Sequence, residues 1–305
     1  MSLFRYILIL SFTAILFLLP FRERNLTGSI DYSREEITTD IFLPVYTFKE
    51  TVKIKDYFKV VDSIVERYNS ILAHQVSEHL IIRNNPWVID SLAASDYYHL
   101  KDHGIINLNP KELLIFKPGD QLIIPDSAAV DSLEYLFENI HLDLNIPEFK
   151  LRVLQRDSII YEFPVRVGRN ERKYLAMAEG VVDLRTRTGV GTIVEHSKEP
   201  KFINPTNNHR YFVTQRDDGI FTDLPNIPWL VTETNGMRYG QLIHPTTNIE
   251  TLGKAYSNGC IGISEAAAWY IYYHAPIGTR IVIRYDLEIV DDKGDTLRLP
   301  NIYNL

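Results

Sequence analysis

The sequence predicts a mainly β domain, a β-sandwich or flattened barrel with one helix, preceded by a small α+β domain and an N-terminal membrane helix. Three observations support this fold class. From His141 onward, short runs of β-branched and aromatic residues alternate with polar turns, as in all-β domains. Residues 54–72 instead follow the apolar spacing of an amphipathic helix. A long apolar run lies near the N-terminus.

The composition is that of a folded protein and argues against a nucleic-acid partner. The 305 residues suffice for one large domain or two ordinary ones, and 45% of them are hydrophobic against 23% charged. The formal net charge is -7, so there is no excess of lysine and arginine to neutralise phosphates. Cys260 is the only cysteine, which excludes an internal disulfide bond.

Residues 1–24 are expected to form a signal anchor. The apolar run 6–19 follows Arg5 and, as a helix ending near residue 21, is slightly shorter than the hydrocarbon core of a bilayer. It is not followed by a small-residue cleavage site, which favours an uncleaved anchor over a cleaved signal peptide. The polar residues 25–41 are then expected to be a tether.

Residues 42–126 are expected to form the small α+β domain. Within residues 54–72, apolar side chains recur at spacings of three and four, which predicts a helix whose apolar stripe faces a core. Two shorter helical pieces are expected around residues 86–99 and 110–114. Residues 114–125 hold two apolar runs around a Pro-Gly-Asp turn, which predicts a tight turn leading into a short strand.

The pattern of residues 114–125 resembles the closing strand of LysM modules, small βααβ units that bind the glycan chains of peptidoglycan and chitin. The shared features are a leucine, the Pro118-Gly119 turn and the final Leu122-Ile123-Ile124-Pro125. The Gly-Asp-Thr-Leu usual before the first helix is absent, and residues 53–125 exceed the length of one module. The alternatives are therefore a diverged LysM-like wall-binding domain and a family-specific helical spacer.

Residues 127–140 are expected to be a linker with helical character, followed by the β-rich domain over residues 141–286. Ser264 can cap the single helix of that domain, which is expected over residues 266–274. The tail 287–305 is expected to contain a hairpin. Strands are expected at residues 151–154, 159–165, 188–194, 211–213, 241–244 and 280–285.

Cys260 and His244 are the candidate catalytic residues. A thiol is a strong nucleophile only as the thiolate, so it needs a base or a positive charge within reach. His244 ends a predicted strand upstream of Cys260, and Gly259 allows a substrate carbonyl to approach backbone amides. A lone cysteine is more often a small buried hydrophobe and a lone histidine a structural residue, but the pair in one stretch favours catalysis.

Four motifs occur in a fixed order around this pair. The first three are residues 144–149, Pro164-Val165-Arg166-Val167-Gly168 and residues 186–193 (TRTGVGTI). The fourth is His244 followed, after twelve intervening residues, by Ser257-Asn258-Gly259-Cys260. The order and spacing resemble those of the L,D-transpeptidase (YkuD) catalytic domain over about residues 142–286. That family carries a histidine followed by Ser/Thr-x-Gly-Cys, with Pro-Val-x-x-Gly and Thr-Pro-Thr-Gly-x-Phe/Tyr-x-Ile upstream.

The resemblance implies an enzyme that acts on peptidoglycan tetrapeptide stems. Cys260 would attack the carbonyl that precedes D-alanine, and His244 would take the thiol proton and then protonate the leaving amine. The backbone carbonyl of Pro245 would orient His244, and the amides of Gly259 and Cys260 would form the oxyanion hole. The amine of a second stem would then resolve the acyl-enzyme into a crosslink. The residues expected to bind the substrate are Ser257, Asn258 and Tyr239.

The resemblance also implies the surroundings of the reaction. It implies no metal and no cofactor. The expected partners are peptidoglycan stem peptides, glycan strands and, through the N-terminal helix, a membrane. The expected location is the bacterial cell envelope, on the periplasmic side of the cytoplasmic membrane.

Two positions depart from the family motif. Asn258 stands where many members have a second histidine, so a group that titrates is replaced by one that does not. Gly262 stands where an arginine is usual, which removes a cation that would place the substrate or order the loop. Arg238 and Arg280 are the arginines considered as replacements.

Other readings of the same residues stay open at this point. A papain-like hydrolase also uses cysteine and histidine, but its cysteine comes first in sequence, and His274 lies inside a predicted apolar helix. Water as the acceptor would make the enzyme an L,D-carboxypeptidase. The departures at Asn258 and Gly262 also fit a catalytically inactive peptidoglycan-binding protein.

Overall fold

The computed structural model describes residues 44–291 and 293–305. The expected membrane helix within residues 1–24 and the tether 25–41 lie outside these residues. In the described part of the chain, no helix is both long and apolar enough to cross a membrane. Residues 42–305 make up one compact unit.

The centre of this unit is an eight-stranded mixed sheet in the order β19-β17-β16-β11-β20-β5-β6-β7. Two neighbouring pairs, β17 with β19 and β20 with β5, are parallel, and the other pairs are antiparallel. Just after β7, Arg166 forms an isolated antiparallel bridge with Gly262 of β19. The bridge joins the two ends of the strand order, so the sheet is a nearly closed barrel. The expected mainly β fold is therefore confirmed. The strands are β5 (Ile140–Asn145), β6 (Lys150–Gln155), β7 (Ser158–Pro164), β11 (Gly189–Ser197), β16 (Trp229–Thr234), β17 (Leu242–Pro245), β19 (Ile261–Ile263) and β20 (Arg280–Arg284).

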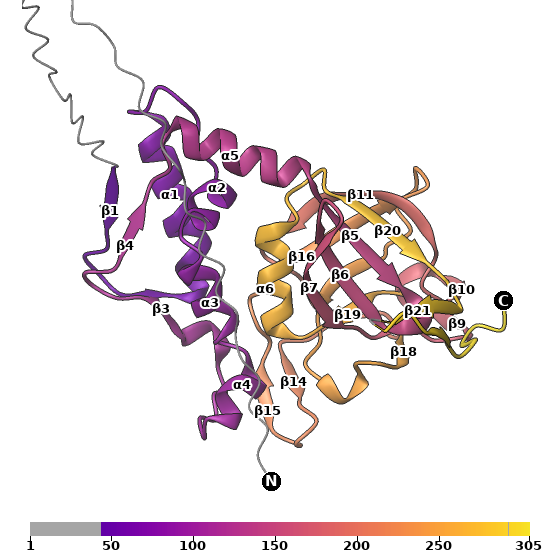
Figure 1. Cartoon of the computed structure of the whole chain (residues 1–305). Helices are drawn as coiled ribbons and strands as arrows, with labels where there is room; N and C mark the ends of the chain where they lie inside the picture. The colour runs from indigo at the N-terminus through magenta and orange to yellow at the C-terminus, as the bar shows by residue number, and fades with distance from the viewer. Residues whose placement is uncertain (1–43, 292) are drawn as a thin grey trace, which may run out of the picture. The chain divides into compact units, whose positions relative to one another are not determined.

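Helix α6 (Glu265–His274) follows β19 directly, as expected. Ser264 caps it by accepting a hydrogen bond from the amide of Ala267 at 3.1 Å. Most of its residues are buried, including Trp269, because other elements cover it on more than one side. In Figure 1 it lies between the N-terminal helices and the strands of the sheet. Its all-round apolar character follows from that central position.

The N-terminal part of the compact unit consists of short helices and two pairs of short strands. The expected helix is confirmed as α1 (Tyr57–Asn69), preceded by a 3-10 turn at Ile54–Asp56. The Pro-Gly-Asp turn is present, but the strands on either side of it pair with β2 and β1 and not with each other. The remaining elements are β1 (Val45–Thr47), β2 (Val52–Lys53), α2 (Glu78–Arg83), α3 (Trp87–Ala93), α4 (Tyr97–Asp102), a 3-10 turn (Pro110–Glu112), β3 (Leu114–Phe116) and β4 (Gln121–Ile123).

The helical part packs on α6 through a continuous core. The Tyr57 and Tyr273 hydroxyl oxygens lie 2.5 Å apart, and the rings of Phe58 and Trp269 pack at a centroid distance of 6.1 Å. Helix α5 (Ser127–Glu138) covers the range expected to be a linker and leads directly into β5. The parts of the chain before and after α5 thus share one hydrophobic core.

In the described residues, five small two-stranded pairs and several 3-10 turns surround the barrel. The expected tail hairpin is present as β21 and β22, whereas the segment around residues 211–213 contributes to a small hairpin and not to the main sheet. These strands are β8 (Val167–Gly168), β9 (Arg172–Leu175), β10 (Gly180–Asp183), β12 (Ile203–Asn204), β13 (His209–Arg210), β14 (Val213–Gln215), β15 (Phe221–Asp223), β18 (Ala255–Ser257), β21 (Glu288–Val290) and β22 (Thr296–Arg298). The 3-10 turns are Ile146–Glu148, Ala176–Ala178 and Ile249–Thr251.

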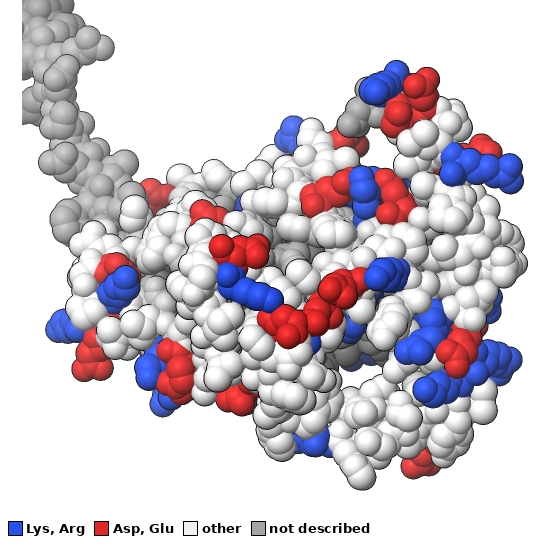
Figure 2. Space-filling model, turned by 90° about the horizontal axis from the view of Figure 1, so that it is seen from below, with Lys and Arg blue, Asp and Glu red and all other residues white. Residues whose placement is uncertain are grey.

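Charged side chains of both signs are interspersed on the face drawn in Figure 2. One ion pair is buried instead: Arg216 and Glu265, both almost without exposure, approach to 2.6 Å. Glu265 begins α6 and also accepts a hydrogen bond from the amide of Tyr97 in α4. The pair therefore ties the β14–β15 hairpin and the helical part to the start of α6, since a buried charge needs such partners.

Candidate active site

His244 and Gly262 are neighbours on the parallel strands β17 and β19. Side chains of paired residues point to the same face of a sheet, and alternate residues point to the same side. Ile243, Ile261 and Ile263 are fully buried on the core face. His244 and Gly262 therefore share the other face, and Cys260, two residues before Gly262, is adjacent to it.

The ring of His244 is held on two sides. Its Nδ1 lies 2.9 Å from the backbone oxygen of Pro245, the carbonyl expected from the family resemblance. Trp229 of β16 packs against the ring at a centroid distance of 5.4 Å. Because Nδ1 donates its proton to a carbonyl, the neutral ring leaves Nε2 free to accept a proton. Burial, together with the charge of Arg166, lowers the pKa of His244 to about 4.

Cys260 is half-buried in the loop between β18 and β19. Its Sγ lies 3.8 Å from the backbone oxygen of Gly240. Burial raises the pKa of the Cys260 thiol, although the amide of Leu242 and the charge of Arg166 act in the opposite direction. At neutral pH the pair is therefore a thiol and a neutral imidazole, which suits a base that takes the proton during attack.

The loop before Cys260 depends on a glycine. Gly259 has a φ of 114°, which an L-amino acid with a side chain rarely adopts. Its amide donates to Ser257 Oγ at 3.2 Å, and Ser257 Oγ donates to the Cys260 carbonyl at 2.6 Å. The Cys260 amide forms no hydrogen bond with the described residues. Of the two amides expected to form an oxyanion hole, that of Cys260 is free and that of Gly259 is engaged by Ser257.

A second layer supports this loop from behind. Thr186 Oγ1 donates to the Gly259 carbonyl at 3.0 Å and accepts from the Gly168 amide at 2.8 Å. The buried Tyr303 hydroxyl donates to the Gly168 carbonyl at 2.7 Å and accepts from the Thr186 amide at 3.0 Å. Sequence reasoning assigned no role to Tyr303, because nothing in the tail indicates which distant loop its hydroxyl meets.

Both departures from the family motif contact an arginine of the segment that follows β7. Arg169 Nη2 donates to Asn258 Oδ1 at 3.1 Å. The side chain of Arg166 lies directly over Gly262, where an added Cβ would come within 2.4 Å of Nε. Of the two arginines considered from the sequence, Arg238 Nε lies 3.6 Å from a carboxylate oxygen of Glu233, and Arg280 belongs to a strand four places from β19.

Aromatic side chains continue from His244 along the same side of the barrel. Phe202 packs against Trp229 at a centroid distance of 4.9 Å and against Tyr211 at 5.9 Å. The ring of Tyr239, which is expected to bind substrate, lies under the guanidinium of Arg187, with 4.8 Å between the guanidinium carbon and the ring centroid. Among the described residues, no group of three histidine, cysteine or carboxylate side chains could hold a metal ion.

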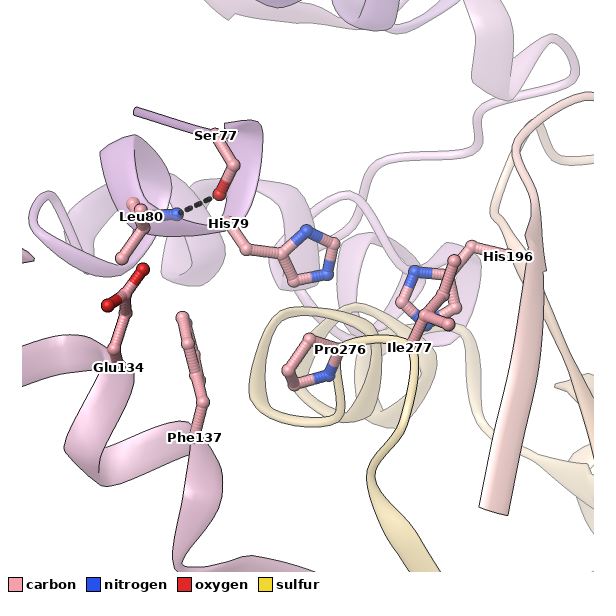
Figure 3. Close-up of a pocket in the computed structure, with 8 residues that line it drawn as sticks. All are labelled: Ser77, His79, Leu80, Glu134, Phe137, His196, Pro276 and Ile277. Carbon is pink, nitrogen blue, oxygen red and sulfur yellow. Dashed lines mark hydrogen bonds between the residues drawn. The ribbon is translucent and has the colours of Figure 1, made fainter. Parts of the chain in front are cut away.

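A separate cavity of about 310 Å³ lies away from Cys260. Its lining includes His79 of α2, His196 of β11 and Pro276 after α6. Figure 3 shows the rings of His79 and His196 beside each other above Pro276. Their centroids are 5.2 Å apart and their planes differ by 22°. This cavity belongs to the packing between the helical part and the barrel.

The fold and the site together define a class of domain: a nearly closed β barrel that carries a half-buried cysteine and a neutral, carbonyl-oriented histidine. Residues 139–283 match the model of the L,D-transpeptidase catalytic domain, YkuD. No curated protein sequence matches the chain.

Solved L,D-transpeptidases resemble the chain over part of its length. The match to an L,D-transpeptidase from Mycobacterium smegmatis has 14% identity and a TM-score of 0.34. It covers 48% of this chain and 58% of the M. smegmatis chain. One from Xylanimonas cellulosilytica is 14% identical, covering 79% and 99%, with a TM-score of 0.36. One from Mycobacterium tuberculosis is 14% identical, covering 48% and 57%, with a TM-score of 0.30.

Proposed function

We propose that the protein is a cysteine-dependent L,D-transpeptidase that acts on peptidoglycan tetrapeptide stems. The observation that carries the proposal is that residues 139–283 match the catalytic-domain family, while His244 lies on β17 and Cys260 lies just before β19, the strand paired with β17. The neutral His244 takes the Cys260 proton as sulfur attacks the carbonyl before D-alanine. The same histidine then returns the proton to the leaving amine, and D-alanine departs.

The oxyanion of the tetrahedral intermediate is stabilised by the free amide of Cys260. The Gly259 amide joins it when Ser257 Oγ gives up its 3.2 Å contact. Removal of one such donor elsewhere costs about 3–4 kcal/mol of transition-state stabilisation. The acyl group on Cys260 is then transferred to the side-chain amine of a second stem, which forms a crosslink. Asn258 and Tyr239 flank the loop and contact the peptide.

The test uses the full chain with a disaccharide-tetrapeptide and mass spectrometry. The expected products are free D-alanine and a crosslinked dimer, and a carbapenem is expected to leave a covalent adduct on Cys260. Cys260→Ala is expected to lose product and adduct together while unfolding at the same temperature. Absence of all products and of the adduct in the parent protein would refute the enzymatic proposal.

Two other functions are distinguished by the same experiment. Loss of D-alanine without dimer formation identifies an L,D-carboxypeptidase that uses water as acceptor. Binding of intact peptidoglycan without any turnover identifies a catalytically inactive binding protein. The presence of both His244 and Cys260, with His244 Nδ1 against the Pro245 carbonyl, favours the transpeptidase.

We also propose that the protein acts in the cell envelope and is anchored by residues 1–24. The support is the apolar sequence of this segment together with the peptidoglycan substrate proposed above. A diverged LysM-like role of residues 42–126 in glycan binding is part of the same proposal. Membrane fractionation of the full chain, and pull-down with purified peptidoglycan, test these two points separately.

A further inference from the structure

The side chain of Arg166 occupies the space that Gly262 leaves empty. Backbone hydrogen bonds of 2.9 and 3.0 Å join the two residues where the barrel closes. A Cβ on residue 262 would lie 2.4 Å from Nε and 2.6 Å from Cγ of Arg166. Arg166 can therefore lie across the strand only because residue 262 is glycine.

The position of Arg166 follows from the register of the strands. His244 pairs with Gly262, and Gly262 bridges to Arg166, so the three residues form a row on one face of the sheet. The guanidinium fills the middle position of this row, beside the catalytic pair. Its positive charge accordingly lowers the pKa of both His244 and Cys260, in each case as a secondary contribution after burial.

Among the described residues Arg166 has no carboxylate partner, in contrast to Arg284 and Arg216. Arg284 approaches Asp143 to 2.8 Å, and Arg216 approaches Glu265 to 2.6 Å. Within the described residues, the side chain of Arg166 makes one hydrogen bond, from Nη1 to Thr251 Oγ1 at 3.3 Å. Its Nε is buried without any partner. A half-buried cation with an unsatisfied donor is a site for an anion.

We propose that Arg166 binds the free carboxylate of the D-amino acid that leaves during acylation. This inference rests on the proposed function and adds a specificity-determining residue to it. In the leaving D-amino acid the carboxylate is attached to the carbon that carries the reacting nitrogen. His244 must reach that nitrogen to protonate it, so the carboxylate also lies close to His244. The Arg166 side chain lies next to His244, over Gly262.

The inference explains how the chain dispenses with the arginine usual at position 262. In this chain the cation belongs to Arg166, in the segment that follows β7, and not to residue 262 of β19. The glycine at position 262 leaves space for the Arg166 side chain. The charge is thus kept while its point of attachment changes.

The first test compares two peptides, a stem tetrapeptide with a free C-terminal carboxylate and the same peptide amidated there. The parent protein is expected to prefer the free acid by roughly tenfold to a hundredfold in kcat/KM, as for a charge-assisted hydrogen bond. Arg166→Gln is expected to lose this preference and Arg166→Lys to keep part of it. Arg238→Gln, which removes an exposed arginine, is the matched control and is expected to retain it.

A second measurement needs no turnover. The free-acid peptide is expected to protect Cys260 from iodoacetamide in the parent protein, whereas the amidated peptide is not. Arg166→Gln is expected to abolish the protection and, without peptide, to slow alkylation at pH 8.5 because the thiolate loses a nearby cation. Protection without D-alanine release would refute the proposed function and leave the carboxylate site standing.

The inference is overturned if the parent protein handles both peptides equally, or if Arg166→Gln keeps the preference for the free acid. Should Arg166→Gln fail to fold, the charge can be relocated with Arg166→Ala combined with Gly262→Arg. Removing Arg166 frees the space around residue 262, so this double variant is expected to fold and to recover part of the preference. A folded double variant without any preference would refute the role of the cation.

Discussion

The chemistry of this site is set by which residue carries a charge and which does not. At pH 7 His244 is neutral, because burial and the nearby Arg166 lower its pKa to about 4. Cys260 is a thiol, because burial raises its pKa. The site therefore holds its proton on sulfur at rest and transfers it only when a carbonyl is attacked. A thiolate–imidazolium pair, the alternative for cysteine enzymes, is disfavoured by the lowered pKa of His244 and the raised pKa of Cys260.

Alkylation of Cys260 by iodoacetamide is expected to rise with pH towards a midpoint above the ordinary cysteine value of 9. Burial disfavours the thiolate, so the reactive form accumulates only in alkaline solution. His244 is expected to add no inflection between pH 5 and 8, since it titrates near pH 4. Mass spectrometry of the modified chain against pH measures both effects. A midpoint below pH 8 would show an ion pair and contradict the neutral resting state.

At the scale of elements, the active-site loop depends on a hairpin-bearing tail that carries none of the reacting groups. The Tyr303 hydroxyl bridges the Gly168 carbonyl and the Thr186 amide. Thr186 in turn holds the carbonyl of Gly259 at 3.0 Å. Three segments far apart in sequence therefore fix the conformation of the residue that precedes the nucleophile.

Tyr303→Phe is expected to destabilise the protein by about 1–3 kcal/mol, because it leaves a buried carbonyl and a buried amide without partners. It is also expected to lower the rate of Cys260 acylation, since Gly259 loses support. Urea unfolding and carbapenem adduct formation measure the two effects. Tyr174→Phe is the control, because Tyr174 is largely exposed on β9. Equal stability of the two variants would contradict a role of Tyr303 in supporting the active-site loop.

For the molecule as a whole, the contact between the helical part and the barrel contains neutral histidines, of which His79 and His196 are half-buried and His274 is buried. His79 and His196 lie 3.0 Å from the carbonyl oxygens of Tyr272 and Ala275 in and after α6. Burial lowers the pKa of each to about 4, and that of His274 to about 3. Lys198 stands close enough to His79 and His196 to lower their pKa further.

The protein is therefore expected to lose stability in acid. In the unfolded chain these histidines take up protons near pH 6.5, whereas in the folded chain they remain neutral down to about pH 4. Their contribution is complete above pH 6.5 and is lost progressively as the pH falls towards 4. The measurement is the melting temperature at intervals between pH 7.5 and 4.5. His196→Gln is expected to flatten the decline, while the control His209→Gln, an exposed position, leaves it unchanged; a flat parent profile contradicts the expectation.

The features that the sequence predicted correctly depend on residues that lie close together in the chain. The stripe within residues 54–72, the cap at Ser264 and the motif around Cys260 are all encoded within a few turns of chain. Arg166 was not identified, because its role depends on a pairing with Gly262 that no local periodicity contains. The packing of the helical part on α6 was missed for the same reason: an apolar face indicates burial but not its partner.

The hydrogen bonds of Tyr303 also affect when the active-site loop can be completed during synthesis of the chain. A polypeptide is made from its N-terminus, and Gly168, Thr186 and Gly259 all emerge before residue 303. The nucleophile loop therefore acquires its full set of supporting hydrogen bonds only after the tail has been made, even if the earlier strands have already paired. The last residues of the chain thus complete the support of a loop that was made more than forty residues before them.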